Sequence, residues 1–154
     1  MDDLRELYQS MILDHGRTPR NFEVLEHANC VQEGVNPVCG DRLTVYLEVN
    51  DGIIESVSFK GEGCAISMAS ASLMTQALKH QTIEHATRLF DAFHQLITAE
   101  GELSNQQEEL LDKLIVLKGV CQYPMRVKCA TLAWHALKGA LSGQSKQEPV
   151  TTEE

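Results

Sequence analysis

The sequence has no long apolar run and no excess of positive charge. In 154 residues, no stretch approaches the roughly 18 apolar residues that a membrane span needs, so we expect no membrane partner. Its 13 lysines and arginines against 22 aspartates and glutamates leave a net charge of −9, which argues against nucleic acid because phosphate binding needs a cationic surface. The start, Met1-Asp2-Asp3-Leu4, lacks the cationic and then apolar order of a signal peptide. We therefore expect a cytoplasmic protein.

Cysteine is present, but the Cys-X-X-Cys pair typical of thiol oxidoreductases is not. The 5 cysteines are an odd number, and in a cytoplasmic chain they are expected to stay reduced. We therefore do not expect a disulfide framework. The cysteines are metal ligands, reactive thiols or small core residues.

The apolar pattern predicts an α+β domain in which a small antiparallel sheet of about three strands packs against several helices. Alternating runs on both sides of Asn50-Asp51-Gly52 predict a hairpin over 43–60, and a short strand near 29–33 adds a third strand. Helical patterns occupy 4–12, 64–80, 82–100, 104–118 and 124–141. We predict one domain over residues 1–142 and a flexible polar tail over residues 143–154.

Three cysteines are placed where they can converge. Cys39 lies in a turn-forming run just before the predicted hairpin, and Cys64 lies just after it, so the hairpin returns both to one end of the sheet. Asp41 is two residues from Cys39 and can point at the same ion, while Cys129 lies in the last predicted helix. Three thiols and a carboxylate suit tetrahedral zinc or an iron–sulfur cluster. From spacing alone, small buried core residues are an equal alternative for Cys64 and Cys129.

Three separated motifs resemble those of the IscU/NifU-type iron–sulfur cluster assembly proteins, and the similarity spans nearly the whole chain. The motifs are Asn36-Pro37-Val38-Cys39-Gly40-Asp41, Gly61-Glu62-Gly63-Cys64-Ala65-Ile66-Ser67 and Arg126-Val127-Lys128-Cys129-Ala130-Thr131-Leu132-Ala133-Trp134. Two features are similar to the SufU branch of this family. Lys128 stands where the IscU branch has histidine before its last cysteine, and the long stretch between Cys64 and Cys129 leaves room for an extra helical segment, about residues 101–118. The Leu-Pro-Pro-Val-Lys chaperone-docking motif of the IscU branch is absent.

The resemblance implies a zinc-dependent sulfurtransferase that accepts persulfide sulfur from a pyridoxal-phosphate-dependent, SufS-like cysteine desulfurase and supplies the iron–sulfur assembly machinery. It also implies a set of zinc ligands with Cys39 as the catalytic acceptor: Cys39, Asp41, Cys64 and Cys129. Chemistry favours Cys39, because an acceptor thiol must be deprotonated and reachable, and a glycine-flanked loop is more reachable than a helix. The ligands carry −4 in total, so we expect nearby cations, Lys128 and Arg126, to support them with positive charge.

Two other functions remain open from the sequence. The same ligands suit a scaffold that holds iron or a nascent [2Fe–2S] cluster, and total charge does not distinguish the metals, because Zn²⁺ and [2Fe–2S]²⁺ both leave −2. Lys128 in place of histidine favours the sulfurtransferase. An interaction module with a purely structural zinc is less supported, because such a site gains little from an aspartate ligand and a flexible loop. Of the remaining cysteines, Cys30 is expected in the core and Cys121 at the surface.

Overall fold

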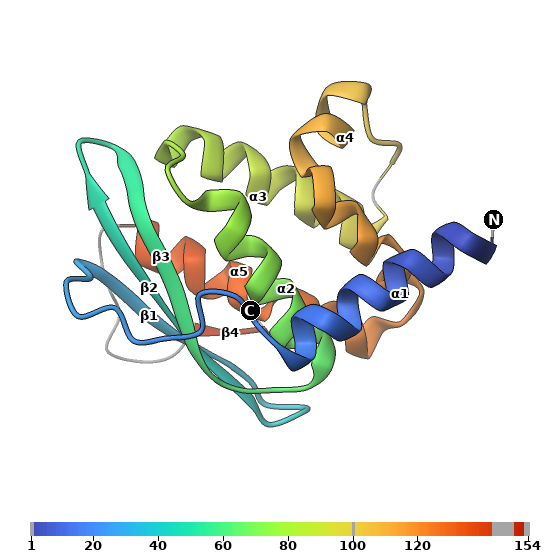
Figure 1. The fold of residues 1–154 in the computed structure, drawn as a ribbon, viewed down its shortest axis with the longest axis horizontal. Helices are drawn as coiled ribbons and strands as arrows, with labels where there is room; N and C mark the ends of the chain where they lie inside the picture. The colour runs from blue at the N-terminus through green and yellow to red at the C-terminus, as the bar shows by residue number, and fades with distance from the viewer. Residues whose placement is uncertain (1, 100, 143–149, 153–154) are drawn as a thin grey trace.

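The computed structural model describes residues 2–99, 101–142 and 150–152, and these form an α+β domain (Figure 1). The elements, in chain order, are α1 (Asp2–Arg17), β1 (Cys30–Asn36), β2 (Asp41–Asn50), β3 (Ile53–Glu62), α2 (Ala65–Leu78), α3 (Ile83–Thr98), α4 (Asn105–Leu111), the 3₁₀ helix η1 (Asp112–Gln122), α5 (Pro124–Leu141) and β4 (Val150–Thr151). The predicted fold class, a small sheet packed against several helices, is confirmed.

The sheet has the strand order β3-β2-β1-β4. β1 pairs antiparallel with β2, and β2 pairs antiparallel with β3, as the hairpin prediction requires. The hairpin turn has positive φ at Asp51 (53°) and Gly52 (76°), which is the reason that an Asp-Gly pair favours this turn. The short β4 pairs in parallel with Gly34 and Val35 of β1. It falls within the predicted tail; residues 143–149 and 153–154 of that tail lie outside the described residues.

One face of the sheet carries the hydrophobic core. Leu43, Val45 and Leu47 alternate along β2 and are each 0% exposed, which matches the period-two pattern of the sequence. α2 packs on β3, and α5 packs on β1 and β2 on this face (Figure 1). Trp134 of α5 stacks on Phe93 of α3 with ring centroids 4.4 Å apart, so α3 is anchored to α5. Helix α5 therefore packs against both the sheet and α3.

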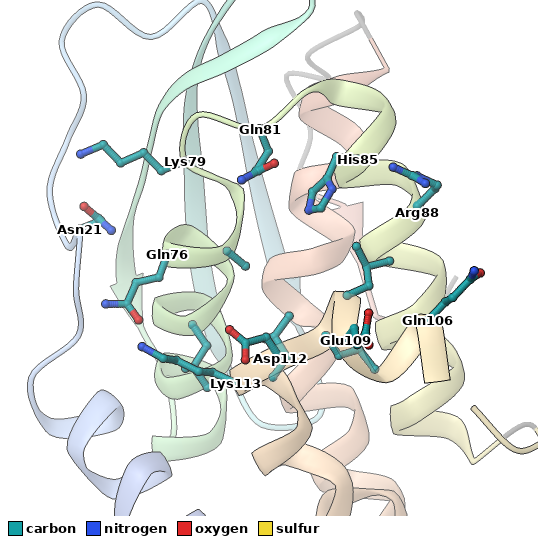
Figure 2. Close-up of a pocket in the computed structure, with 15 residues that line it drawn as sticks. Asn21, Gln76, Lys79, Gln81, His85, Arg88, Gln106, Glu109, Asp112 and Lys113 are labelled. Carbon is teal, nitrogen blue, oxygen red and sulfur yellow. The ribbon is translucent and has the colours of Figure 1, made fainter. Parts of the chain in front are cut away.

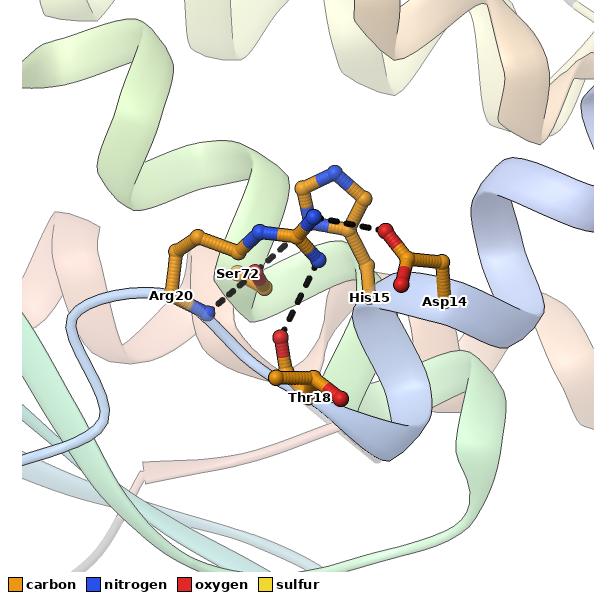
Figure 3. Close-up of polar contacts among 5 residues, drawn as sticks. All are labelled: Asp14, His15, Thr18, Arg20 and Ser72. Atoms are coloured by element: carbon orange, nitrogen blue, oxygen red, sulfur yellow. Dashed lines mark hydrogen bonds and ion pairs between the residues drawn. The ribbon is translucent and has the colours of Figure 1, made fainter.

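Helix α1 is fastened to α2 by a small polar network (Figure 3). His15 Nδ1 lies 2.7 Å from Ser72 Oγ, and the backbone N–H of Arg20 donates to the same oxygen at 2.8 Å. The Arg20 side chain pairs with Asp14 at 2.6 Å and donates to the Thr18 carbonyl at 3.0 Å. These contacts fix the end of α1 and the start of the following loop against the middle of α2.

The segment after α3 differs from its prediction. The capping box is present, since Gln107 N–H donates to Ser104 Oγ and Ser104 N–H donates to Gln107 Oε1. The helix, however, ends at Leu111 rather than continuing to Gly119. Asp112 has a φ of 48°, which interrupts the α-helical hydrogen-bond ladder, and the chain continues as η1.

Candidate metal centre

The candidate ligands come from three parts of the fold that meet at one end of the sheet. Cys39 lies in the turn between β1 and β2, and Asp41 is the first residue of β2. Cys64 is the N-cap of α2, directly after β3. The β2–β3 register pairs Arg42 with Glu62, so the turn before β2 and the connection after β3 are neighbours. Cys129 is contributed by the second turn of α5.

Three of the four candidate ligands place their atoms close enough for one ion, and Cys39 lies beside this group without belonging to it. One carboxylate oxygen of Asp41 and the sulfurs of Cys64 and Cys129 are all within 4.8 Å of one another. The sulfur of Cys39 lies 3.7 Å from that of Cys129. Ligands on a tetrahedral zinc with bonds of about 2.3 Å are separated by about 3.8 Å. Thiolates together with a carboxylate are also donors that zinc accepts, so the arrangement fits this metal.

One of the three thiols is buried and the other two are exposed. Cys129 is 4% exposed, whereas Cys39 and Cys64 are exposed. Burial raises the pKa of the Cys129 thiol, and the neighbouring Cys64 and Cys39 raise it further. A bound divalent cation opposes this effect, because it stabilises thiolates. The candidate centre therefore has a buried thiol at Cys129 and accessible thiols at Cys39 and Cys64.

Ser67 organises two of the candidate ligands. Its hydroxyl donates to Asp41 Oδ2 at 2.5 Å, and its backbone N–H donates to Cys64 Sγ at 3.5 Å. Ser67 is 0% exposed, so these contacts are sheltered from water. In the sequence, Ser67 is part of the motif around Cys64, for which no role of this serine was predicted. The three-residue spacing from Cys64 to Ser67 could have indicated this contact, because an N-cap side chain accepts from the backbone N–H three residues later.

Asn36 is a second residue for which the sequence predicted no role. It is 0% exposed and its Nδ2 donates to the sulfur of Cys129 at 3.8 Å. Asn36 and Cys129 are 93 residues apart in the chain, so no local pattern pointed to this contact.

The two predicted supporting cations lie on α5. Arg126 is exposed, and its guanidinium carbon lies 4.7 Å from the centroid of the Tyr123 ring. Lys128 is half-buried and adjoins Cys129. Their supporting role at the metal centre stays a prediction.

The remaining cysteines lie outside this group. Cys30 is half-buried against the core, and burial raises the pKa of its thiol. Cys121 is half-buried rather than fully exposed, and with Lys118 it lines a cavity of about 420 Å³.

A larger cavity, of about 940 Å³, lies away from the cysteines (Figure 2). It is bordered by the C-terminal half of α2, the start of α3 and the α4–η1 segment. Its labelled polar lining includes Lys79, His85, Arg88, Glu109 and Lys113. None of the candidate metal ligands lines it, so the candidate metal centre lies outside this cavity.

Comparison with known proteins agrees with the geometry. Residues 7–130 match the family model described as the NifU-like N terminal domain. The chain is similar to the zinc-dependent sulfurtransferase SufU of Bacillus subtilis (strain 168), with 41% identity over 146 residues and 95% of each chain covered. It is also similar to the iron–sulfur cluster assembly scaffold protein IscU of Streptococcus pyogenes serotype M1, with 35% identity over 151 residues, covering 98% of this chain and 92% of that protein.

A solved structure has the same fold. It is the crystal structure of a candidate iron–sulfur cluster assembly scaffold protein for the SUF system, from thermophilic Fervidobacterium islandicum AW-1. The TM-score is 0.81 at 33% identity, with 89% of this chain and 98% of that chain covered. In the described part of this chain, no helix is both long and apolar enough to cross a bilayer. The resemblance seen in the three cysteine motifs is thus confirmed, and the chain belongs to the NifU-like N-terminal domain family of iron–sulfur cluster assembly proteins.

Proposed function

We propose that this protein is a zinc-dependent sulfurtransferase that accepts persulfide sulfur from a cysteine desulfurase onto Cys39. One observation carries the proposal. Ligand atoms of Asp41, Cys64 and Cys129 lie within 4.8 Å of one another, and the exposed Cys39 places its sulfur 3.7 Å from that of the buried Cys129. The name of the Bacillus subtilis relative, a zinc-dependent sulfurtransferase, supports it.

The ligand set would be Cys39, Asp41, Cys64 and Cys129. Zinc held there would keep the thiols deprotonated near neutral pH, which is the state that a sulfur acceptor needs. The remaining requirement is access, and the turn carrying Cys39 provides it. Gly40 has a φ of 76°, and a Cβ built on it would meet no atom within 4 Å, so the tip of the turn projects into open space.

The transfer step is a thiol–persulfide exchange. The Cys39 thiolate attacks the outer sulfur of the persulfide that the desulfurase carries on its own cysteine. The sulfur–sulfur bond of the desulfurase breaks, its cysteine leaves as a thiolate, and Cys39 becomes the persulfide. No external oxidant or reductant is consumed, because the sulfane sulfur moves without a net change in electrons. The exposed Cys39 suits the attacking role better than the buried Cys129.

Removing the acceptor thiol tests this function. We expect Cys39→Ala to abolish the stimulation of alanine formation when the protein is mixed with a SufS-like desulfurase and cysteine without reductant. The wild type should gain the mass of one sulfur atom, and the variant should not. Cys121→Ala is the matched control, since Cys121 lies outside the metal group, and it should behave as the wild type. Stimulation that survives Cys39→Ala unchanged contradicts the assignment.

A scaffold function is the second candidate, favoured by the name of the Streptococcus pyogenes relative. The same donor set suits a [2Fe–2S] cluster, with Asp41 as the weaker, exchangeable ligand. Anaerobic reconstitution with iron and sulfide tests it. A stable visible chromophore supports the scaffold, whereas a colourless protein that retains one tightly bound zinc supports the sulfurtransferase.

A further inference from the structure

Asn36 makes several hydrogen bonds within and beside the turn that carries Cys39. Its backbone carbonyl accepts the N–H of Gly40 at 2.8 Å, and its side-chain Oδ1 accepts the N–H of Val38 at 3.3 Å. Its Nδ2 donates to Cys129 Sγ at 3.8 Å. The side chain is 0% exposed, so no water competes for these contacts. One residue therefore braces the turn on both sides of Cys39 and touches the most buried thiol of the centre.

The contacts determine which way the carboxamide of Asn36 points. A backbone N–H can only donate, so the atom facing Val38 has to be the oxygen. The amide nitrogen then faces Cys129, where its N–H can donate to sulfur. A flipped carboxamide would place two donors against each other at Val38 and lose the contact to sulfur.

The second contact that holds this orientation comes from the C-terminal segment. β4 pairs Val150 with Gly34 and Thr151 with Val35. Thr152 then donates its N–H to the Val35 carbonyl at 3.3 Å, and its hydroxyl lies 3.2 Å from Asn36 Oδ1. The Thr152 hydroxyl is the donor in this contact, because Asn36 Oδ1 is a carboxamide oxygen and can only accept. Two donors, from residues 38 and 152, therefore converge on one oxygen.

We propose that Asn36 is a positioning residue for the metal centre and that Thr152 locks its carboxamide. With the lock in place, Nδ2 is held toward Cys129 and the turn is held so that Cys39 meets the other ligands. Without the Thr152 hydroxyl, the carboxamide oxygen of Asn36 loses one of its two hydrogen bonds, so its orientation is held less strongly and the turn loosens. The C-terminal segment is thus part of the centre, although it contributes no ligand. This inference rests on the proposed function, because it takes the cysteines and Asp41 as metal ligands.

Two substitutions of Thr152 in the full-length chain test the lock. Thr152→Val removes the hydroxyl and keeps the shape, whereas Thr152→Ser keeps the hydroxyl and removes a methyl group. The first measurement is zinc affinity by competition with a chelator. We expect Thr152→Val to lower zinc affinity roughly fivefold, the effect of one neutral hydrogen bond. Thr152→Ser should bind zinc as the wild type does.

The second measurement needs no metal and no activity. In the metal-free protein, we expect the amide protons of Val38 and Gly40 to exchange with solvent several-fold faster in Thr152→Val than in the wild type and Thr152→Ser. Amides in the centre of β2 should be unchanged, which separates a loosened turn from a destabilised fold. Asn36→Ala should lower zinc affinity more, by about tenfold or beyond, as loss of a direct partner of a ligand does.

The outcomes separate the inference from the proposed function. Equal zinc affinity and equal exchange in Thr152→Val and the wild type overturn the lock. So does a Thr152→Ser variant as impaired as Thr152→Val, because the methyl group would then be what matters. A wild-type protein that binds no zinc overturns the proposed function instead.

Discussion

At the scale of single residues, the candidate ligands contact side chains that are not ligands themselves. Ser67 connects Asp41 and Cys64, while Asn36 connects Cys129 to the turn. Partners of this kind orient ligands and set their affinity for a metal. The buried hydroxyl of Ser67 and the buried carboxamide of Asn36 contact the candidate ligands in the way that such partners do.

Ser67→Ala is expected to weaken the centre without unfolding the domain. The variant loses the hydrogen bond to Asp41 Oδ2 and the 3.6 Å contact between the hydroxyl and Cys64 Sγ, but it keeps the backbone N–H on Cys64. We therefore expect zinc affinity to fall about tenfold. Chelator competition measures it.

The matched control is Ser70→Ala, one turn further along α2. Ser70 Oγ donates to the Ala130 carbonyl and accepts from Trp134 Nε1, so its loss should cost about 1–3 kcal/mol of folding free energy and leave zinc affinity unchanged. If both variants bind zinc as the wild type does, Ser67 does not orient Asp41.

At the scale of elements, the attachment of α1 to α2 contains a titratable group. His15 is 5% exposed and bonded to Ser72. Burial lowers the pKa of His15, the charges of Arg20 and Lys113 lower it further, and Asp14 opposes them. The folded state therefore favours the neutral imidazole, and protonation works against the docking of α1.

This gives a pH dependence with a definite sign. In the unfolded chain the pKa of His15 is near the ordinary histidine value of 6.5, and in the folded chain the pKa is lower. The folded state thus keeps its full stability above about pH 6.5 and loses stability as the pH falls through the lowered pKa. Urea unfolding at pH 7.5 and 5.5 should show a smaller fall in unfolding free energy for His15→Asn than for the wild type. His135, whose pKa burial also lowers, adds a fall of the same sign in both proteins. Equal falls in the two proteins would contradict a role for His15.

At the scale of the whole molecule, the candidate ligands join the sheet to two helices. They come from the β1–β2 turn, the start of β2, the cap of α2 and the second turn of α5. A metal bound by all of them links elements that are distant in the chain. Its binding free energy therefore adds to the stability of the complete fold.

Zinc is accordingly expected to raise the melting temperature. Free zinc at 100 times its dissociation constant adds about 2.7 kcal/mol, a shift of several degrees for a domain of this size. The shift should shrink at pH 6, because protons compete with zinc for the thiols. Calorimetry with and without zinc at both pH values measures it. Cys30→Ala should retain the shift and Cys129→Ser should lose most of it; an equal shift in both variants would place the zinc elsewhere.

The local sequence was enough for most of the elements and for naming the candidate ligands, although it did not predict η1 or β4. The alternation along β2, the Asp51-Gly52 turn and the capping box at Ser104 are short-range effects of backbone geometry, and the structure contains all three. The cysteine motifs pointed to the family in the same way, because the residues that carry each motif are adjacent in the chain.

Only the tertiary structure decided what surrounds the ligands. Asn36 meets Cys129 across 93 residues and Thr152 across 116, and no periodicity or turn rule acts over such separations. The break at Asp112 was equally hidden, since Leu114 and Leu117 reach the core in a 3₁₀ helix as the pattern required of an α-helix. Hydrophobic patterning specifies which side chains are buried, whereas hydrogen-bond partners between distant segments are specified only once those segments have packed.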